Sequence, residues 1–537
     1  MRAGWRIYLI WACFASRLLF YAAMLPLWEG FDEWAHFAVI RAMAAGGGPL
    51  VARGAPVPRD VAESLNLAPV AWELRNYPPP AVTQDGFWTL PADERARREA
   101  AFGNLPAGWG SQSGPASLTA YEALQPPLYY WLMAPAARLL GGRSLAAQVL
   151  VIRWLSALLA SLAIPLVYQV ARAVFADVRV ALGCAAVAAL MPEWALDVAR
   201  VGNDGLSAVL FTGVLWLGLK LVEEGPRLRW AAALGTALGL GLLTKAWFLT
   251  AVPAVALLFL WLARGGVARA ARAGALAAGI AAAISSWWYV HNVATTGTLS
   301  GLSESVMLRR AGAGEMASGA LTVPWLRAVD SILLSHLYFG GWSSLEVRSW
   351  MYHLFYAVIL LAAAGLLRMA LARRRAAVGW LLAVYLAFWA GQLYNVVLIW
   401  LSKGVPTSMG WYLYAVVAAE VGLAVAGLRA LLPEKAGNWP VAAGVLLFGL
   451  LDLYTVHAVA IPYYTGMIRH KAWGALGALH AVDFHAVGFG EALRRLTVFK
   501  GGVVTEPILV ALWVAYLAAT AALMVAGARG GRRNILR

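Results

Sequence analysis

The sequence predicts an all-α polytopic membrane protein with about twelve transmembrane helices. Of its 537 residues, 61% are hydrophobic and only 13% are charged, and the mean hydropathy is +0.67. Its 26 tryptophans are typical of the aromatic belts at the two membrane surfaces. The net charge of +16 does not indicate a nucleic-acid-binding protein, because the basic residues form small clusters between apolar segments rather than one basic face.

The predicted spans are apolar segments that mostly approach the ~20 residues needed to cross a bilayer as a helix. They are 5–27, 146–171, 179–197, 205–222, 230–244, 246–263, 273–291, 352–371, 377–400, 411–430, 440–461 and 507–527. We expect the first to be a retained span, because no A-x-A-like cleavage site follows it. Segments 230–244 and 246–263 are short and meet at Thr244–Lys245, so a hairpin that does not fully cross is an alternative for this pair.

The distribution of arginine and lysine predicts that both termini are cytoplasmic. With this orientation, most basic residues in short connections fall inside: Arg172, Arg179, Arg227, Arg229, Arg264, Arg269, Arg272, Arg368, Arg373 to Arg375, Arg429, Lys435 and the arginines of the C-terminal tail. Three long segments, 28–145, 292–351 and 462–506, then lie outside. Because the inner connections are too short to form a domain and contain no phosphate-binding loop, we expect any chemistry on the outer face.

The first polar motif is "EGFDEWAHFAVIRAM", residues 29–43, directly after the first span. On a helix beginning near Asp32, the i, i+4 spacing brings Asp32 and His36 to one face, and Glu33 and Arg41 to the adjacent one. One carboxylate at a helix start could simply be a cap, but two acids beside a histidine favour a general base. A divalent metal on Asp32 and His36 is a weaker alternative, because two ligands make an incomplete site.

Further stretches contain polar residues beside the predicted spans. "YEALQPPLYYWLMAPAARLLGG" (121–142) predicts a helix in the membrane interface, with Gln125 before the Pro-Pro turn and Tyr129 after it. "MPEWALDVARVGNDGLSAVLF" (191–211) crowds ionisable groups into a short outer connection, which is typical of cavities, although Asn203–Asp204 could be a helix cap. The candidate substrate-binding residues are His36, Arg41, Gln125, Tyr129, Arg200, Asn203, Asp204, Lys245, His291, Asn292, Lys403 and Tyr412.

Lys245, in "GLGLLTKAWFLTAVPA", is the candidate ligand of an anionic group, with a snorkelling side chain as the alternative. The preceding Gly235 and Gly239 satisfy G-x-x-x-G, a weak indication of close helix packing.

Together these motifs resemble the C-type (GT-C) membrane glycosyltransferases, in particular the branch of the protein O-mannosyltransferases and the lipid A aminoarabinose transferases. The family's acidic pair is matched by Asp32–Glu33, its "PPL-aromatic-aromatic" segment by Pro126 to Tyr130, its second-loop acid by Asp204, and its "LTK" pattern by Leu243 to Lys245. The resemblance covers about residues 1–300, which implies a catalytic transmembrane core at 1–300 and a variable region at 301–537. The chain departs from many relatives at Gln125, where they have His, Lys or a similar residue.

The resemblance implies an inverting transfer of sugar from a polyprenyl-phosphate donor to an outer-face acceptor, which could be a lipid, a glycan or a protein. It also implies a multi-pass protein in a plasma membrane of the bacterial inner-membrane type. Asp32 or Glu33 would be the catalytic base, and basic residues would hold the leaving phosphate. No soluble cofactor or nucleic acid is implied; a divalent metal, if used, would take Asp32, His36 and Asp204.

The competing function is a secondary transporter or lipid flippase, supported by the twelve apolar segments and the charges near them. Transporters of this size often contain two similar halves. Residues 270–537 contain no second copy of "FDEWAHF" or "QPPLYY", and the first outer segment is long for a transporter. The sequence therefore favours an enzyme.

Overall fold

The computed structural model describes residues 4–46, 48–76, 81–372, 376–433, 436, 438–471 and 474–532. The described chain is helical, and its few β-bridges are isolated pairs outside any strand. Among the described residues, ten helical segments are long and apolar enough to cross a membrane, and the number is eleven if the bent pair Val178–Leu190 and Pro192–Val198 is counted as one span. The prediction of an all-α polytopic membrane protein is thereby confirmed. Of the basic residues predicted to be cytoplasmic, Arg373 to Arg375, Lys435, Arg533 and Arg537 lie outside the described residues.

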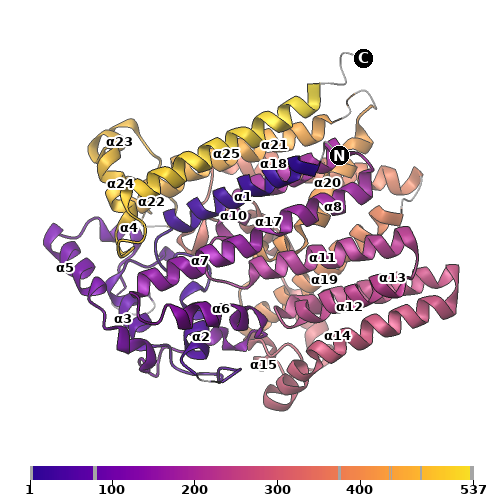
Figure 1. Ribbon diagram of the computed structural model, residues 1–537, viewed down its shortest axis with the longest axis horizontal. Coiled ribbons are helices and arrows are strands. Elements are labelled where there is room, and N and C mark those ends of the chain that lie inside the picture. Colours follow the sequence, from indigo (N-terminus) through magenta and orange to yellow (C-terminus); the bar gives the residue numbers. More distant parts are fainter. Residues whose placement is uncertain are drawn as a thin grey trace.

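The helices of the bundle, which run across Figure 1, are α1 (Gly4–Met24), α7 (Leu145–Ser161), α8 (Ala163–Phe175), α9 (Val178–Leu190), α10 (Pro192–Val198), α11 (Asp204–Glu224), α12 (Leu228–Leu242), α13 (Ala251–Leu262), α14 (Val267–Thr296), α18 (Ser349–Ala372), α19 (Ala376–Lys403), α20 (Val417–Leu431), α21 (Trp439–Tyr454), α22 (Ile461–Tyr464) and α25 (Glu506–Arg532). Short turns η4 (Ala246–Thr250), η5 (Ala263–Gly265), η7 (Gly410–Val416) and the π-helix η9 (Thr455–Ala460) extend them.

The segments between these helices contain α2 (Glu33–Ala44), α3 (Arg59–Leu67), α4 (Gln84–Phe87), α5 (Ala92–Gly103), α6 (Leu128–Leu139), α15 (Ser303–Met307), α16 (Ala313–Thr322), α17 (Trp325–Leu337), α23 (Ala481–Val487) and α24 (Phe489–Thr497). They also contain η1 (Trp72–Leu74), η2 (Ala107–Ser111), η3 (Tyr121–Leu124) and η6 (Gly341–Ser343). Helices α2 to α6, α23 and α24 gather at one end of the bundle, on the left of Figure 1, away from the start of α1 and the end of α25. The first and third of the long segments predicted to be outside therefore build one end of the bundle.

Two breaks in the helices of the bundle lie next to the residues of the candidate site. Pro192 is the first residue of α10, and the chain bends there by 65° relative to α9, because proline cannot donate the backbone hydrogen bond that would continue a helix. The second interruption is Leu243–Lys245, between α12 and η4. Helix α12 is the short member of the predicted 230–244/246–263 pair, whereas Ala246–Gly265 is long enough to cross.

Helix α12 packs closely against α14 through its two spaced glycines. A Cβ on Gly235 would lie 2.4 Å from the carbonyl oxygen of Ala277, and one on Gly239 would lie 2.9 Å from Cβ of Ile284. The absence of side chains therefore lets the two backbones approach, as the G-x-x-x-G spacing predicts.

The first of the three long segments predicted to be outside contacts both of the others. The Glu29 carboxylate accepts hydrogen bonds from the backbone nitrogen of Ser343 at 3.1 Å and from its hydroxyl at 2.9 Å. Phe31 stacks on Trp411 with 3.5 Å between ring centroids. The indole of Trp88 donates to the carbonyl of Tyr464 at 2.8 Å. Residues near 30, 88, 343 and 464 thus form one assembled cap.

Candidate active site

Asp32 occupies the position before α2, but its carboxylate does not cap the helix. The residue has φ +55° and ψ +19°, in the left-handed region, and makes no side-chain cap hydrogen bond. Its carboxylate instead accepts a hydrogen bond from the Tyr121 hydroxyl at 2.6 Å. Left-handed backbone is uncommon for a residue with a side chain, although aspartate tolerates it better than most. The simple capping interpretation of Asp32 is therefore wrong.

Glu33 has a different environment from its neighbour. Its side chain is fully buried, and both carboxylate oxygens contact the guanidinium of Arg153, at 2.6 and 2.5 Å. The same oxygens accept from the backbone nitrogens of Trp28 at 3.1 Å and Val201 at 3.0 Å. A carboxylate with four such donors is committed to holding α2 against α7 and the connection before α11.

A second carboxyl group, Glu122, lies near the imidazole one helical turn after Asp32. His36 Nδ1 lies 2.9 Å from the Tyr130 hydroxyl, and its Nε2 lies 3.7 Å from Glu122 Oε2. Burial lowers the pKa of His36 well below its usual value, so the imidazole is neutral. Burial, followed by repulsion from Asp32, raises the pKa of Glu122 to about 8. Glu122 is therefore mainly protonated at neutral pH.

The pKa of Asp32 is also raised, chiefly by burial. The hydrogen bond from Tyr121 and the charges of Arg200 and Lys245 oppose this rise. A carboxylate with a raised pKa and a side chain that is only partly buried can accept a proton from a bound hydroxyl group.

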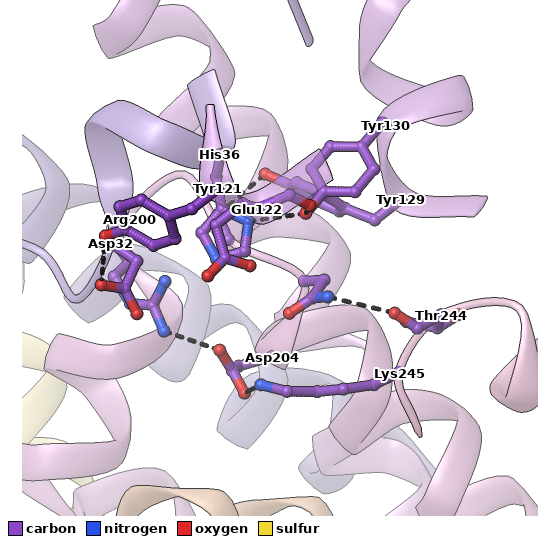
Figure 2. A network of polar contacts seen from close by, with 12 residues as sticks. Asp32, His36, Tyr121, Glu122, Tyr129, Tyr130, Arg200, Asp204, Thr244 and Lys245 are labelled. Carbon is purple, nitrogen blue, oxygen red and sulfur yellow. Dashed lines mark hydrogen bonds and ion pairs between the residues drawn. The ribbon is translucent and has the colours of Figure 1, made fainter. Parts of the chain in front are cut away.

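Two cations lie beside these carboxyl groups, and Asp204 holds both (Figure 2). Arg200 Nη2 contacts Asp204 Oδ2 at 2.6 Å and Asp197 Oδ1 at 2.8 Å, while Lys245 Nζ contacts Asp204 Oδ1. All four side chains are buried. The Lys245 ammonium also lies 4.8 Å from the centre of the Tyr412 ring. Because Lys245 is buried and paired, the snorkelling interpretation is wrong.

Arg200 keeps donors that nothing in the described chain uses. Its Nε and Nη1 atoms are buried without a hydrogen-bond partner. The backbone fits closely around its side chain, since a Cβ on Gly30 or Gly202 would lie 2.6 or 2.1 Å from it. Buried charged donors without partners are expensive, and they indicate a place for an anion.

The motifs "QPPLYY" and "LTK" meet at this site through the backbone. The Leu128 nitrogen donates to the Leu243 carbonyl at 2.9 Å, and Asn203 Nδ2 donates to the Thr244 carbonyl at 3.1 Å. Gln125 Oε1 and Asn203 Oδ1 are buried without partners. Tyr129 serves the framework, because its hydroxyl lies 2.7 Å from Ser156 Oγ and accepts from the Gly202 nitrogen at 3.0 Å.

Four predicted substrate-binding residues make their contacts elsewhere. Arg41 is buried against Asp60 and Gln148. Asn292 donates to the carbonyls of Leu299 and Ser300, and His291 is exposed beside Trp288. Lys403 pairs with Glu304 at 2.5 Å and is half-exposed. Their contacts serve packing and loop structure, and none of these contacts includes a residue of the Asp32 cluster.

The three residues proposed for a metal do not fit that role. Both Asp204 oxygens already contact cationic side chains, which would repel a divalent ion. In the described part of the chain, no group of three or more His, Cys, Asp or Glu side chains is placed to hold a metal.

Glu122, Tyr121 and Tyr130 are the site residues that sequence reasoning missed. All three belong to the same stretch as Gln125, but η3 is a single 3-10 turn without a periodic pattern. Only their position close to the Pro-Pro turn in the sequence could have indicated that they belong to the site.

The comparisons with known proteins agree with part of this description. Residues 124–290 match the family model described as dolichyl-phosphate-mannose-protein mannosyltransferase. The match includes Gln125, Arg200, Asp204 and Lys245. It begins at residue 124 and therefore does not include Asp32. It favours a transferase over a transporter. No curated protein matches the chain.

Three solved structures show limited likeness. The ArnT structure from Cupriavidus metallidurans bound to undecaprenyl phosphate is 16% identical, with 99% of this chain and 78% of that chain covered, at a TM-score of 0.47. Its apo form is also 16% identical, with 96% and 75% covered, at a TM-score of 0.44. The Archaeoglobus fulgidus oligosaccharyltransferase in complex with zinc and sulfate is 18% identical, with 72% and 49% covered, at a TM-score of 0.37. Over residues 124–290 the chain is similar to the dolichyl-phosphate-mannose-protein mannosyltransferases, and its resemblance to the C-type membrane glycosyltransferases is confirmed there.

Proposed function

We propose that the protein is an inverting glycosyltransferase that moves a sugar from a polyprenyl-phosphate donor to an acceptor on the extracytoplasmic face of the membrane. The observation that carries the proposal is the juxtaposition of Asp32 with a cationic pair. The Asp32 carboxylate makes no capping hydrogen bond to α2. The charges of Arg200 and Lys245 are close enough to lower the pKa of this carboxylate. A base and an anion site side by side suit transfer from a phosphate leaving group.

The chemistry assigns one task to each group. Asp32 accepts the proton of the acceptor hydroxyl as its oxygen forms a bond to the anomeric carbon. The bond between that carbon and the phosphate oxygen breaks on the opposite face, which inverts the anomeric configuration. The electron pair leaves with the polyprenyl phosphate, and the unused donors of Arg200 together with Lys245 stabilise its charge.

Glu33 and Asp204 are positioning residues in this proposal. Glu33 holds the start of α2 through Arg153, and Asp204 orients both cations. Protonated Glu122 adds no second negative charge where the donor phosphate must bind.

Mass spectrometry of lipids that co-purify with the wild type and with Asp32→Asn tests the proposal. The asparagine keeps the shape of the side chain but cannot act as the base. We expect the variant to retain an intact polyprenyl-phosphate sugar, and the wild type to carry polyprenyl phosphate without the sugar after incubation with membrane acceptors. If neither protein carries a polyprenyl lipid, and neither cleaves an added polyprenyl-phosphate sugar, the proposal is wrong.

A further inference from the structure

Two adjoining cavities lie at the end of the bundle opposite Asp32. The first, of about 780 Å³, is lined by α11, α13, α18 and α19, and the second, of about 580 Å³, by the ends of α11 and α13 and the start of α14. Both are lined by Val222, Trp261 and Arg264, so they form one continuous groove. Each volume lies in the range of about 300–1,000 Å³ that is usual for ligand sites.

The groove is about one membrane thickness from the candidate active site. Helix α11 begins at Asp204, in the site, and ends at Glu224, in the groove. Its 21 residues span about 30 Å at ~1.5 Å per residue. Figure 1 shows α11, α13 and α14 extending away from α2 and α6 toward this end. The groove therefore cannot be part of the Asp32 site.

The larger cavity has an apolar wall. Leucines at 257, 258, 366, 382 and 386 line it together with several alanines, and Leu257 and Leu386 are more than half exposed. Such a surface between helices accommodates a hydrocarbon chain.

The smaller cavity supplies positive charge. Arg227, Arg264 and Arg269 line it beside one acid, Glu224. Glu224 is neutralised by Arg229 at 2.7 Å and by Arg227 at 3.4 Å. Arg269 donates only to the Gly265 carbonyl, and Arg264 makes no hydrogen bond or ion pair with any described residue. Two arginines thus remain available at the mouth of an apolar groove.

We propose that this groove binds an anionic phospholipid of the leaflet opposite the active site, with its phosphate on Arg264 and Arg269 and an acyl chain along α13 and α19. The argument is charge complementarity: an apolar slot that ends in unpaired arginines matches an amphiphile with an anionic head group. The positive-inside distribution of basic residues places this end in the cytoplasmic leaflet. The proposal does not depend on the reaction at Asp32.

Titration in nanodiscs of zwitterionic phosphatidylcholine with increasing phosphatidylglycerol tests the charge. Retained phosphatidylglycerol is measured by native mass spectrometry. We expect Arg264→Gln/Arg269→Gln to weaken its retention by about 10- to 30-fold, from ~1 kcal/mol for each basic residue at a lipid surface. Arg172→Gln/Arg179→Gln removes two charges in the last turn of α8 and at the start of α9, outside the groove, and should have no such effect. Equal weakening in both pairs would indicate a general surface attraction and overturn the proposal.

A second pair of variants tests the acyl slot without changing charge. Gly379 lines the groove, and a Cβ there would meet nothing within 4 Å, so Gly379→Leu fits and obstructs the slot. Gly279→Leu is the matched control, because its Cβ is equally unopposed and it does not line the groove. We expect only Gly379→Leu to reduce retention. Unchanged retention in this variant, or competition by inorganic phosphate or polyprenyl phosphate as effective as by phosphatidylglycerol, would contradict an anionic-phospholipid site.

Discussion

Glu33 and Arg153 form a fully buried, two-point ion pair between α2 and α7. Arg153 Nε lies 2.6 Å from Glu33 Oε1, and Nη2 lies 2.5 Å from Oε2. The remaining guanidinium donors contact the carbonyls of Ala22, Leu25 and Pro26, at the end of α1. The pair therefore fixes the chain on both sides of Asp32 and separates the roles of two adjacent acids.

Glu33→Gln should mainly reduce stability. Removing one partner leaves the Arg153 charge buried, at a cost of about 3–5 kcal/mol, so the thermal midpoint in detergent should fall. Adding Arg153→Met should restore part of the loss, because the stranded charge is removed although three carbonyls lose their donor. Activity per folded molecule should fall less than in Asp32→Asn. Full stability combined with abolished turnover would instead make Glu33 the base.

Asp32→Asn should reduce turnover by about 10²–10⁴-fold, the usual contribution of a general base. The thermal midpoint and donor saturation should change little, because the carboxylate provides no cap and no buried ion pair. Kinetics with a polyprenyl-phosphate sugar, alongside thermal unfolding, measure both. Near-normal turnover would remove Asp32 from the mechanism.

Tyr121→Phe refines the same assignment through its pH profile. The Tyr121 hydrogen bond lowers the pKa of Asp32 against the larger effect of burial. Without it, the pKa of Asp32 rises further, and the acidic limb of the rate profile should move to higher pH. An unshifted limb would show that Asp32 does not determine it.

Glu122→Gln should change the alkaline side of the profile. Burial and the Asp32 charge raise the pKa of Glu122 to about 8, so the wild type gains a negative charge as pH rises through this value. That charge repels a donor phosphate, and the donor KM should increase above about pH 8. Glutamine keeps the neutral state, so its donor KM should stay flat, whereas an identical alkaline rise in both proteins would exclude Glu122 as the cause.

Cysteine labelling tests the orientation that the basic residues predict. Ala116 and Arg179 are both exposed, and they should be labelled from outside and inside the cell, respectively, after substitution by cysteine. Gly114 would be a poor choice, because a Cβ there would lie 2.8 Å from the Val57 carbonyl oxygen. The two native cysteines, Cys13 and Cys184, are buried and should react slowly. Labelling of both positions from one side would contradict the orientation.

The sequence predicted the parts of the site that follow from topology. Asp32, Asp204 and Lys245 each lie next to the end of an apolar segment that is predicted to face outside. When the segments are oriented consistently, these outer ends lie on one side of the membrane, so the three residues can come together. The bend at Pro192 and the close approach at Gly235 are also local properties of the residue types.

The sequence could not predict pairings that depend on distant contacts. Arg41 has its partners 19 and 107 residues away, in Asp60 and Gln148, and nothing in their spacing indicates this. The left-handed backbone of Asp32 is imposed by its surroundings, since a glycine would be the usual residue there. Burial of Glu122 likewise depends on how η3 meets α2.

Lys245→Met should weaken use of the lipid-linked donor. The ammonium contacts Asp204 and lies above the Tyr412 ring, and it has three donors, so further ones remain for a phosphate. Losing a charged hydrogen bond of about 1.5–3 kcal/mol should raise the donor KM by about 10- to 100-fold, with acceptor KM unchanged. Lys245→Arg should restore part of the effect, because charge is kept while the geometry differs. Asp204→Asn separates the two roles of the pair: it leaves Lys245 charged but no longer oriented, and should impair donor use less than Lys245→Met. If donor saturation and turnover of Lys245→Met equal those of the wild type in the same detergent, Lys245 only balances the Asp204 charge, and the phosphate must bind Arg200 alone.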